Sequence, residues 1–278
     1  SEFFLELFSE EMPANLQSLA RNNLLINFKI FFEKENIEYK NDAKVISTPN
    51  RLVIYFKNVN KEIIQKSEEI RGPSVNAPEK AISGFIKSNN IEKNNIYKKK
   101  TEKGEFFFYK KPSKKIKTIE LLNEQIPIIL NKLSWKKSMK WGEHDLYWGR
   151  PLKSLFGVFD GQSLKFKFHH LISSNGTFID NEFEEKIKNF KNFSSYLSYF
   201  KKLNVIIDND VRKNYIEKKL LKLAKSRNLR ININTKLLNE VSNIVDKPKI
   251  ILCNFNKKYL DIPKEIIIIT MQQHQKYF

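Results

Sequence analysis

The chain has 278 residues, of which 41% are hydrophobic, so it can bury a sizeable core and is not expected to be disordered. Its formal net charge of +19 favours a polyanionic partner such as nucleic acid, an acidic protein or an anionic lipid surface. The single cysteine, Cys253, excludes a disulfide framework and a cysteine metal site.

The first sixty residues predict a strand, a helix and a hairpin. The run "FFLELF" at residues 3–8 is typical of a strand. Apolar residues then recur at helical intervals over about residues 15–33, behind Pro13 at the expected helix start. The apolar runs at 43–48 and 51–59 flank a Pro-Asn turn, which indicates a hairpin.

The next sixty residues predict a short helix at 78–90 and a hairpin at 96–111 that turns around Lys103-Gly104. A longer helix is expected over 116–133. Pro127 would kink or interrupt it, because proline lacks the amide donor that a helix interior needs.

Beyond this helix we expect three strands, at 145–148, 155–159 and 164–168, with the tight turn "DGQS" between the last two. The pattern then changes to charged helices. These are predicted at 181–202, at 209–228 with Asn209 or Asp210 as the cap, and at 234–245, before a strand at 247–255.

The predicted fold class is α+β, with intermixed antiparallel sheets and helices rather than a regular β-α-β alternation. We expect two lobes: an α+β region at 1–170 and a more helical region at 171–278. The boundary rests only on the shift towards helices.

Several kinds of catalytic chemistry have no support in the sequence. The eight glycines form neither a phosphate-binding loop nor a dinucleotide fingerprint. His169 and His170 are adjacent on a predicted strand and would point to opposite faces, so they form no metal site by themselves. No nucleophile, base and acid can be assembled from spacing. We therefore expect no catalytic residue and no metal ligand in this chain.

A succession of short motifs carries a family resemblance. In chain order they are Glu10 to Pro13, Thr48 to Leu52, Arg71 to Pro73, Ala81 to Phe85, Lys103 to Glu105 followed by Tyr109, Met139 to Gly142, Arg150-Pro151, and Thr270-Met271 with His274 to Phe278. Their order and spacing resemble those of the β subunit of bacterial heterotetrameric glycyl-tRNA synthetase, over nearly the whole chain.

The resemblance implies a part of an enzyme that joins glycine to its tRNA with ATP and Mg²⁺. In that family the adenylate-forming site lies in the α subunit, so no cofactor is expected on this chain. The implied partners are the α subunit, tRNA(Gly) and a second β subunit in an α2β2 assembly. Members of the family run on through an HD-like helical region to an anticodon-binding domain, so we expect this chain to be an N-terminal portion.

The sequence departs from the family pattern at several positions. Asn50 stands where a second arginine is usual, and Lys247 where a tryptophan is common. Asp180, Asn181 and Glu182 stand where basic residues and a histidine are typical, which weakens the expectation of a local tRNA contact there.

The segment "KKSMKWGEHDLYWGRP" is the first candidate RNA-binding surface. Bases could stack on Trp141 or Trp148 while Lys136, Lys137 and Lys140 hold phosphates. The alternative is that the rings fill a core and the lysines are merely solvated.

Other candidate tRNA contacts are spread along the chain. Arg51, Arg71 and Arg150 would each bind phosphate or brace backbone carbonyls. His274 and Lys276 in "HQKYF" would contact RNA or belong to a packed turn.

We therefore interpret the chain as a noncatalytic, tRNA-binding and assembly portion of glycyl-tRNA synthetase. The alternative is a structural scaffold that binds the α subunit without touching tRNA. Lysine supplies 43 of the 50 basic residues, as in proteins of A+T-rich genomes, so codon bias is a second explanation for part of the charge. The reduced cysteine, the lack of a secretory signal and the lack of a long apolar run predict a cytoplasmic protein without membrane partners.

Overall fold

A computed structural model describes residues 1–65, 67–102, 104–179 and 186–278. The chain divides into two compact units: unit 1, Ser1–Lys61 with Ile119–Phe278, and unit 2, Glu62–Thr118. Both combine antiparallel strands with helices, which confirms the α+β prediction. The boundary expected near residue 170 falls inside unit 1.

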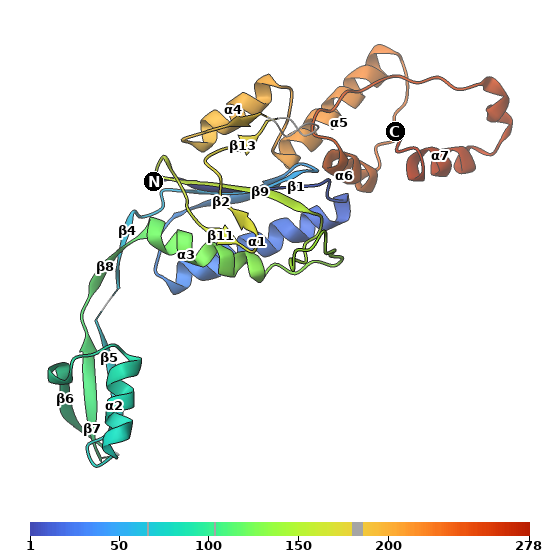
Figure 1. Ribbon diagram of the computed structural model, residues 1–278. Coiled ribbons are helices and arrows are strands. Elements are labelled where there is room, and N and C mark those ends of the chain that lie inside the picture. Colours follow the sequence, from blue (N-terminus) through green and yellow to red (C-terminus); the bar gives the residue numbers. More distant parts are fainter. Residues whose placement is uncertain (66, 103, 180–185) are drawn as a thin grey trace. The chain divides into compact units, whose positions relative to one another are not determined.

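Unit 1 is built on a five-stranded antiparallel sheet in the order β10-β9-β1-β3-β2 (Figure 1). The strands are β1 (Phe3–Ser9), β2 (Lys40–Ser47), β3 (Arg51–Lys57), β9 (Leu152–Phe159) and β10 (Gln162–Ser163). The predicted first strand, the 43–59 hairpin, the strand at 155–159 and its "DGQS" turn are thereby confirmed.

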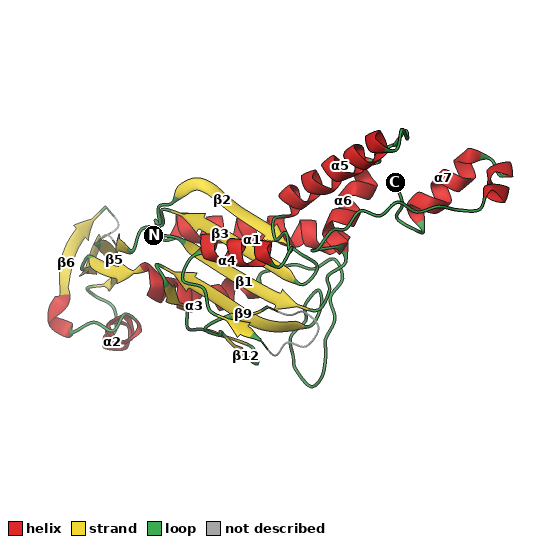
Figure 2. Ribbon diagram, turned by 90° about the horizontal axis from the view of Figure 1, so that it is seen from above, coloured by secondary structure: helices red, strands yellow, loops and turns green. Residues whose placement is uncertain are grey.

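Helices cover both faces of this sheet, which explains why β1 is buried at every position instead of alternating. One face packs against α1 (Ala14–Lys34), whose Phe28 ring lies 5.4 Å from Phe3, and α3 (Thr118–Asn131) lies on the same side (Figure 2). The other face packs against α4 (Phe193–Lys202), whose Tyr196 ring lies 5.6 Å from Phe4.

The predicted helix at 116–133 is confirmed, and it continues through Pro127 without interruption. A proline in a helix interior costs about 3 kcal/mol. Leu122, Ile126 and Leu130 of α3 are fully buried, and burial of each such side chain contributes about 1.5–3 kcal/mol. Packing therefore keeps α3 in one piece.

The remaining elements of unit 1 are short strands and helices. They are β11 (Lys167–Phe168), β12 (Leu171–Ile172), β13 (Thr177–Phe178), β14 (Ile187–Lys188), α5 (Asn209–Ser226), α6 (Thr235–Ile244), η2 (Lys257–Asp261) and α7 (Lys264–Gln273). The helices predicted at 15–33, 209–228 and 234–245 are confirmed as α1, α5 and α6.

Several predictions for unit 1 are wrong in detail. Residues 145–148, all of them described, form only an isolated bridge between Trp148 and Met139. Of the strand predicted at 164–168, only β11 forms. Residues 247–255 lie within the described chain and have no regular secondary structure, although their pattern is apolar.

One helix start and one helix cap also differ from the prediction. α4 begins at Phe193 and not near residue 181. Residues 180–185, which include the family departures at Asp180, Asn181 and Glu182, lie outside the described residues. The cap of α5 is Asp208, which accepts from the amides of Asp210 and Val211, and not Asn209 or Asp210.

Unit 2 contains a two-stranded pair, a three-stranded sheet in the order β5-β7-β6, and one α-helix. The elements are β4 (Glu62–Gln65), β5 (Glu68–Ser74), α2 (Glu79–Ser88), η1 (Lys93–Asn95), β6 (Ile96–Thr101), β7 (Gly104–Lys111) and β8 (Lys114–Lys117). The predicted helix at 78–90 and hairpin at 96–111 are confirmed.

Candidate nucleic-acid interface

The loop between α3 and β9, residues 132–151, is held by packed aromatic rings. Trp148 is only 2% exposed, and its ring lies 4.9 Å from that of Trp135 and 5.7 Å from that of Phe168. Trp148 and Met139 also exchange two backbone hydrogen bonds. The ring of Trp148 therefore fills the core and is not available to stack on a base.

Trp141 belongs to a second, more exposed aromatic group. The rings of His144 and His170 are stacked, with centroids 3.6 Å apart and 6° between their planes. Trp141 meets His170 edge-on at 6.0 Å and is half-buried. His169 and His170 lie in the turn between β11 and β12 and not on a strand, so the expectation that they point to opposite faces of a sheet is wrong.

Burial, followed by the neighbouring His144 and then His169, lowers the pKa of His170. A lowered pKa favours the neutral form of the His170 imidazole, and its Nδ1 has no hydrogen-bond partner among the described residues. His170 therefore adds a ring, and not a further cation, next to the loop.

The cations of the loop lie on its surface. Lys136, Lys137 and Lys140 are all exposed. The Nζ of Lys140 lies 2.6 Å from Asp145, and this hydrogen bond raises the pKa of Lys140. The negative charge of the Asp145 carboxylate offsets part of the positive charge of Lys140. Lys136 and Lys137 make no ion pair with any described residue. They are the cations of the loop most available to a phosphate.

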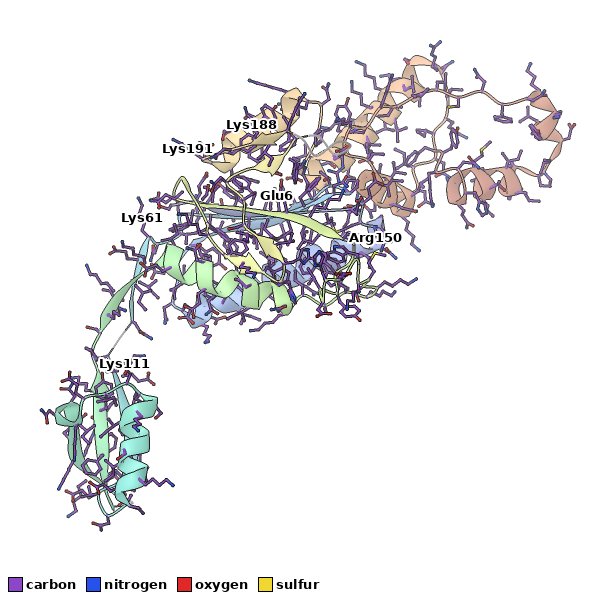
Figure 3. All side chains as sticks on the ribbon, viewed as in Figure 1. Glu6, Lys61, Lys111, Arg150, Lys188 and Lys191 are labelled. Atoms are coloured by element: carbon purple, nitrogen blue, oxygen red, sulfur yellow. The ribbon has the colours of Figure 1, made fainter. Side chains whose placement is uncertain are left out.

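Arg150 ends the loop beside the strand β9 (Figure 3). Its Nη1 donates to the carbonyl of Gly149 at 2.8 Å, and its side chain is half-buried. Arg150 thus braces a backbone carbonyl, and part of it stays accessible.

Arg51 lies in the core of unit 1 and not at a surface. It is 1% exposed, and its Nη1 donates to Glu6 at 3.0 Å and to Thr177 at 2.9 Å. Its Nη2 donates to the carbonyl of Phe178 at 2.5 Å. A buried guanidinium cannot reach a phosphate, so the tRNA contact expected of Arg51 is corrected to structural bracing. Figure 3 shows Glu6, its partner, between the sheet and α4.

The other predicted contacts lie elsewhere. Arg71 is in unit 2, where its guanidinium carbon is 3.7 Å from the centroid of the Phe106 ring. His274 is exposed at the end of α7, and Lys276 pairs with Glu240 on α6 at 2.8 Å. Of the nine candidates, only five share a single segment: Lys136, Lys137, Lys140, Trp141 and Arg150.

Residues 3–278 match the family described as the glycyl-tRNA synthetase beta subunit. The chain belongs to this family. It is 36% identical over 278 residues to the glycine–tRNA ligase beta subunit of Rickettsia canadensis, covering 100% of this chain and 41% of that relative. It is 37% identical over 278 residues to the same subunit of Rickettsia prowazekii, covering 100% of this chain and 42% of the relative. This member of the beta-subunit family thus spans about two fifths of the curated relatives it matches.

Sequence reasoning missed two features of this beta-subunit family member. One is the stacking of His144 on His170, which brings three of the four histidines together because His169 precedes His170. The sequence did not indicate this contact, since His144 and His170 come from segments far apart along the chain. The other is Arg212, which is fully buried and whose Nη2 donates to the carbonyl of Ser47 at 2.9 Å. The only indication in the sequence that Arg212 is buried was its helical spacing to the apolar residues of α5.

Among the described residues of this family member, no group of three or more His, Cys, Asp or Glu side chains is arranged to hold a metal ion. No helix in the described part of the chain is long and apolar enough to cross a membrane.

Proposed function

We propose that this chain is the noncatalytic, tRNA-binding and assembly portion of a glycyl-tRNA synthetase β subunit, and that it contacts tRNA(Gly) through the loop 136–150. One observation carries the proposal. Exposed lysines, Lys136 and Lys137, stand on a loop whose backbone is fixed by the packing of the half-buried Trp135 on the buried Trp148. A rigid display of cations lowers the entropy cost of binding a polyanion.

The exposed ring group adds a second element of RNA recognition. RNA loops are read by stacking of unpaired bases on aromatic side chains, including histidine. Trp141 and His144 of the loop, with His170 of the turn between β11 and β12, offer such rings. The loop and this turn would therefore combine phosphate and base contacts.

The chemistry of the complete enzyme is assigned to other parts. In this proposal the α subunit uses ATP and Mg²⁺ to form the adenylate, and this chain binds neither. The partners are that α subunit, tRNA(Gly) and a second β subunit in an α2β2 assembly in the cytoplasm. Family membership supports this arrangement.

Charge reversal tests the loop. We expect Lys136→Glu with Lys137→Glu to weaken tRNA(Gly) binding and to reduce the slope of log affinity against log salt by about 2, since each phosphate contact contributes roughly one unit. Lys218→Glu with Lys222→Glu on the exposed side of α5 is the matched control. Equal losses in both double variants would show that net charge, and not the loop, sets the affinity.

A scaffold that binds only the α subunit is the second candidate, and one observation favours it. Large apolar side chains are exposed between residues 251 and 269, for example Ile251 at 66%, Leu260 at 62% and Ile266 at 56%. Exposed apolar surface of this kind marks protein interfaces. Salt separates the two candidates, because binding through an apolar interface changes little between 50 and 200 mM salt, whereas tRNA binding falls steeply.

A further inference from the structure

Unit 2 is the most basic part of the chain for its size. Its 57 residues hold 14 basic and 7 acidic side chains, a net charge of +7 out of the total of +19. The other 221 residues share the remaining +12. Unit 2 therefore has about twice the charge density of unit 1, and this surplus has no role in the function proposed for the loop.

The strand register sorts the side chains of the three-stranded sheet onto two faces. Residues opposite one another in antiparallel strands point to the same side. Phe108 of β7 is opposite both Arg71 of β5 and Tyr97 of β6. Phe106 is opposite Lys99. These five residues form one face, which we term the aromatic face.

Helix α2 covers the opposite face of this sheet. A Cβ placed on Gly72 would lie 2.8 Å from the ring of Phe85 in α2. Gly72 follows Arg71, and neighbouring strand residues point to opposite sides. Phe107 and Tyr109 alternate with the residues of the aromatic face and so belong to the helix-covered side. Within the described part of unit 2, no helix covers the aromatic face.

Cations and rings on the aromatic face are already in contact. The guanidinium carbon of Arg71 lies 3.7 Å from the Phe106 centroid, and Nζ of Lys99 lies 5.2 Å from that of Phe108. Tyr97 is stacked on Phe108, with centroids 6.3 Å apart and 27° between the rings. Tyr97 itself is 38% exposed.

Glu69 holds this arrangement in place. It accepts from the hydroxyl of Tyr97 and pairs with Lys99 at 2.5 Å. The ring of Tyr97 and the amine of Lys99 are therefore fixed relative to each other before any ligand arrives. Lys110, opposite Glu69 in the register, is exposed and contributes a further cation.

We propose that the aromatic face of unit 2 is a second RNA-binding surface, which takes unpaired nucleotides. Bases would stack on the exposed ring of Tyr97 and on the outer side of the Arg71 guanidinium, whose inner side rests on Phe106. Lys110 would hold a phosphate, and Lys99 would hold another with an ammonium donor that does not bind Glu69. That these nucleotides belong to tRNA rests on the proposed function; the chemistry of the face specifies only single-stranded RNA.

The composition of the face favours RNA over a protein partner. A protein interface core is usually depleted in charged residues, in particular lysine. Here Arg71 and Lys99, with Lys110 and Glu69 next to them, lie among three rings on a unit of net charge +7. This combination of a positively charged surface with stacking rings is typical of single-strand binding.

The test uses the 278-residue chain with two RNAs, a ten-nucleotide uridine-rich single strand and tRNA(Gly). We expect Tyr97→Ala to weaken binding of the single strand about tenfold, since one stacking partner is lost. Tyr97→Phe keeps the ring and should bind nearly as wild type. Lys99→Gln should weaken binding several-fold, whereas Lys87→Gln, an exposed lysine on α2, should not. Lys99→Gln also provides a readout if Tyr97→Ala does not fold.

Each outcome decides one point. Single-strand binding that is unchanged in Tyr97→Ala and Lys99→Gln overturns the second surface and leaves the loop proposal intact. The same follows if the chain binds tRNA but not the short strand, or if these variants lose α-subunit binding and keep RNA binding. If the chain binds neither RNA, both proposals fail. If only the loop variants lose tRNA affinity while the single strand still responds to Tyr97, both surfaces are supported independently.

Discussion

Glu6 on β1 and Arg51 on β3 form an ion pair in the core of unit 1, with Oε2 and Nη1 3.0 Å apart and neither side chain more than 1% exposed. Tyr196 and Thr177 donate to the same carboxylate. The rings of Phe8 and Phe200 each lie 4.6 Å from the Arg51 guanidinium. The pair thus joins the sheet to α4 and to the segment after β12.

Removal of Arg51 should destabilise the fold without a specific effect on RNA binding. Arg51→Ala leaves the Glu6 carboxylate buried without its countercharge, which costs about 3–5 kcal/mol in free energy of unfolding. Denaturant unfolding measures this loss. The control is Lys34→Ala, since Lys34 is 76% exposed and its pair with Glu35 should contribute under about 0.5 kcal/mol. A change of less than 1 kcal/mol for Arg51→Ala would argue against the bracing role.

Stability should fall in alkaline solution through Tyr196. Burial, followed by the carboxylate of Glu6, raises the pKa of Tyr196 well above 10. Between pH 10 and that raised pKa the unfolded chain loses the phenolic proton and the folded chain keeps it, so stability falls as pH rises. One such group contributes about 1.4 kcal/mol per pH unit.

Tyr196→Phe should remove that part of the slope while lowering stability near pH 7, because a donor to Glu6 is lost. The measurement is the free energy of unfolding at several values between pH 8 and 12. Tyr55 also has a raised pKa, of about 12, caused mainly by burial, so some slope should remain in the variant. A slope identical to that of wild type would contradict the assignment to Tyr196.

A methyl group at Gly149 should damage the loop 136–150, which we propose as the tRNA contact. The added Cβ would lie 2.6 Å from Cζ3 of Trp135, so Gly149→Ala overpacks the contact between Trp135 and Trp148 and should cost about 1–3 kcal/mol. Weaker tRNA binding should accompany it. Gly84→Ala on α2 is the matched control, since nothing lies within 4 Å of its Cβ and the change should stabilise by about 0.5–1 kcal/mol. Equal effects of the two changes would contradict the close packing at Trp135.

His170 should titrate below the usual range of a histidine. The lowered pKa of His170 means that the unfolded chain takes up a proton before the folded one as pH falls below about 6.5. The stability that His170 contributes is therefore present above pH 6.5 and lost as pH falls through the folded pKa. NMR titration of the ring protons measures this.

His144→Ala should move the His170 titration upward, because a neighbouring titrating ring is removed. His274→Ala, at the exposed end of α7, should leave it unchanged. A His170 midpoint at 6.5 in the wild-type chain would contradict the buried, stacked arrangement.

Much of the local structure of this chain could be predicted because local physics decides it. The apolar residues of 15–33 recur at helical intervals, and this pattern predicts a helix whatever surface the helix packs against. The Pro-Asn and "DGQS" turns determine their hairpins through backbone geometry. The strand predicted at 247–255 was wrong, because an apolar run is compatible with a strand and with an irregular segment. The interruption predicted at Pro127 was also wrong, because buried neighbouring side chains keep α3 continuous.

The candidate site was predicted only in part. The loop lysines are neighbours in sequence, so their clustering could be predicted, and their exposure agrees. The stacking of His144 on His170 and the aromatic face of unit 2 depend on strand pairing and on loop packing, which no periodicity shows.

The sequence by itself determined the positive charge, the family motifs and most helices and strands, since each depends on residues close together along the chain. Only the tertiary structure decided which cations can meet a ligand. Arg51 and Lys136 are both cations, but folding places Glu6 against Arg51 from 45 residues away and leaves Lys136 in solvent. A buried cation needs a buried partner to offset the cost of its desolvation, and it then has a structural role. The tertiary structure decides which residue is that partner.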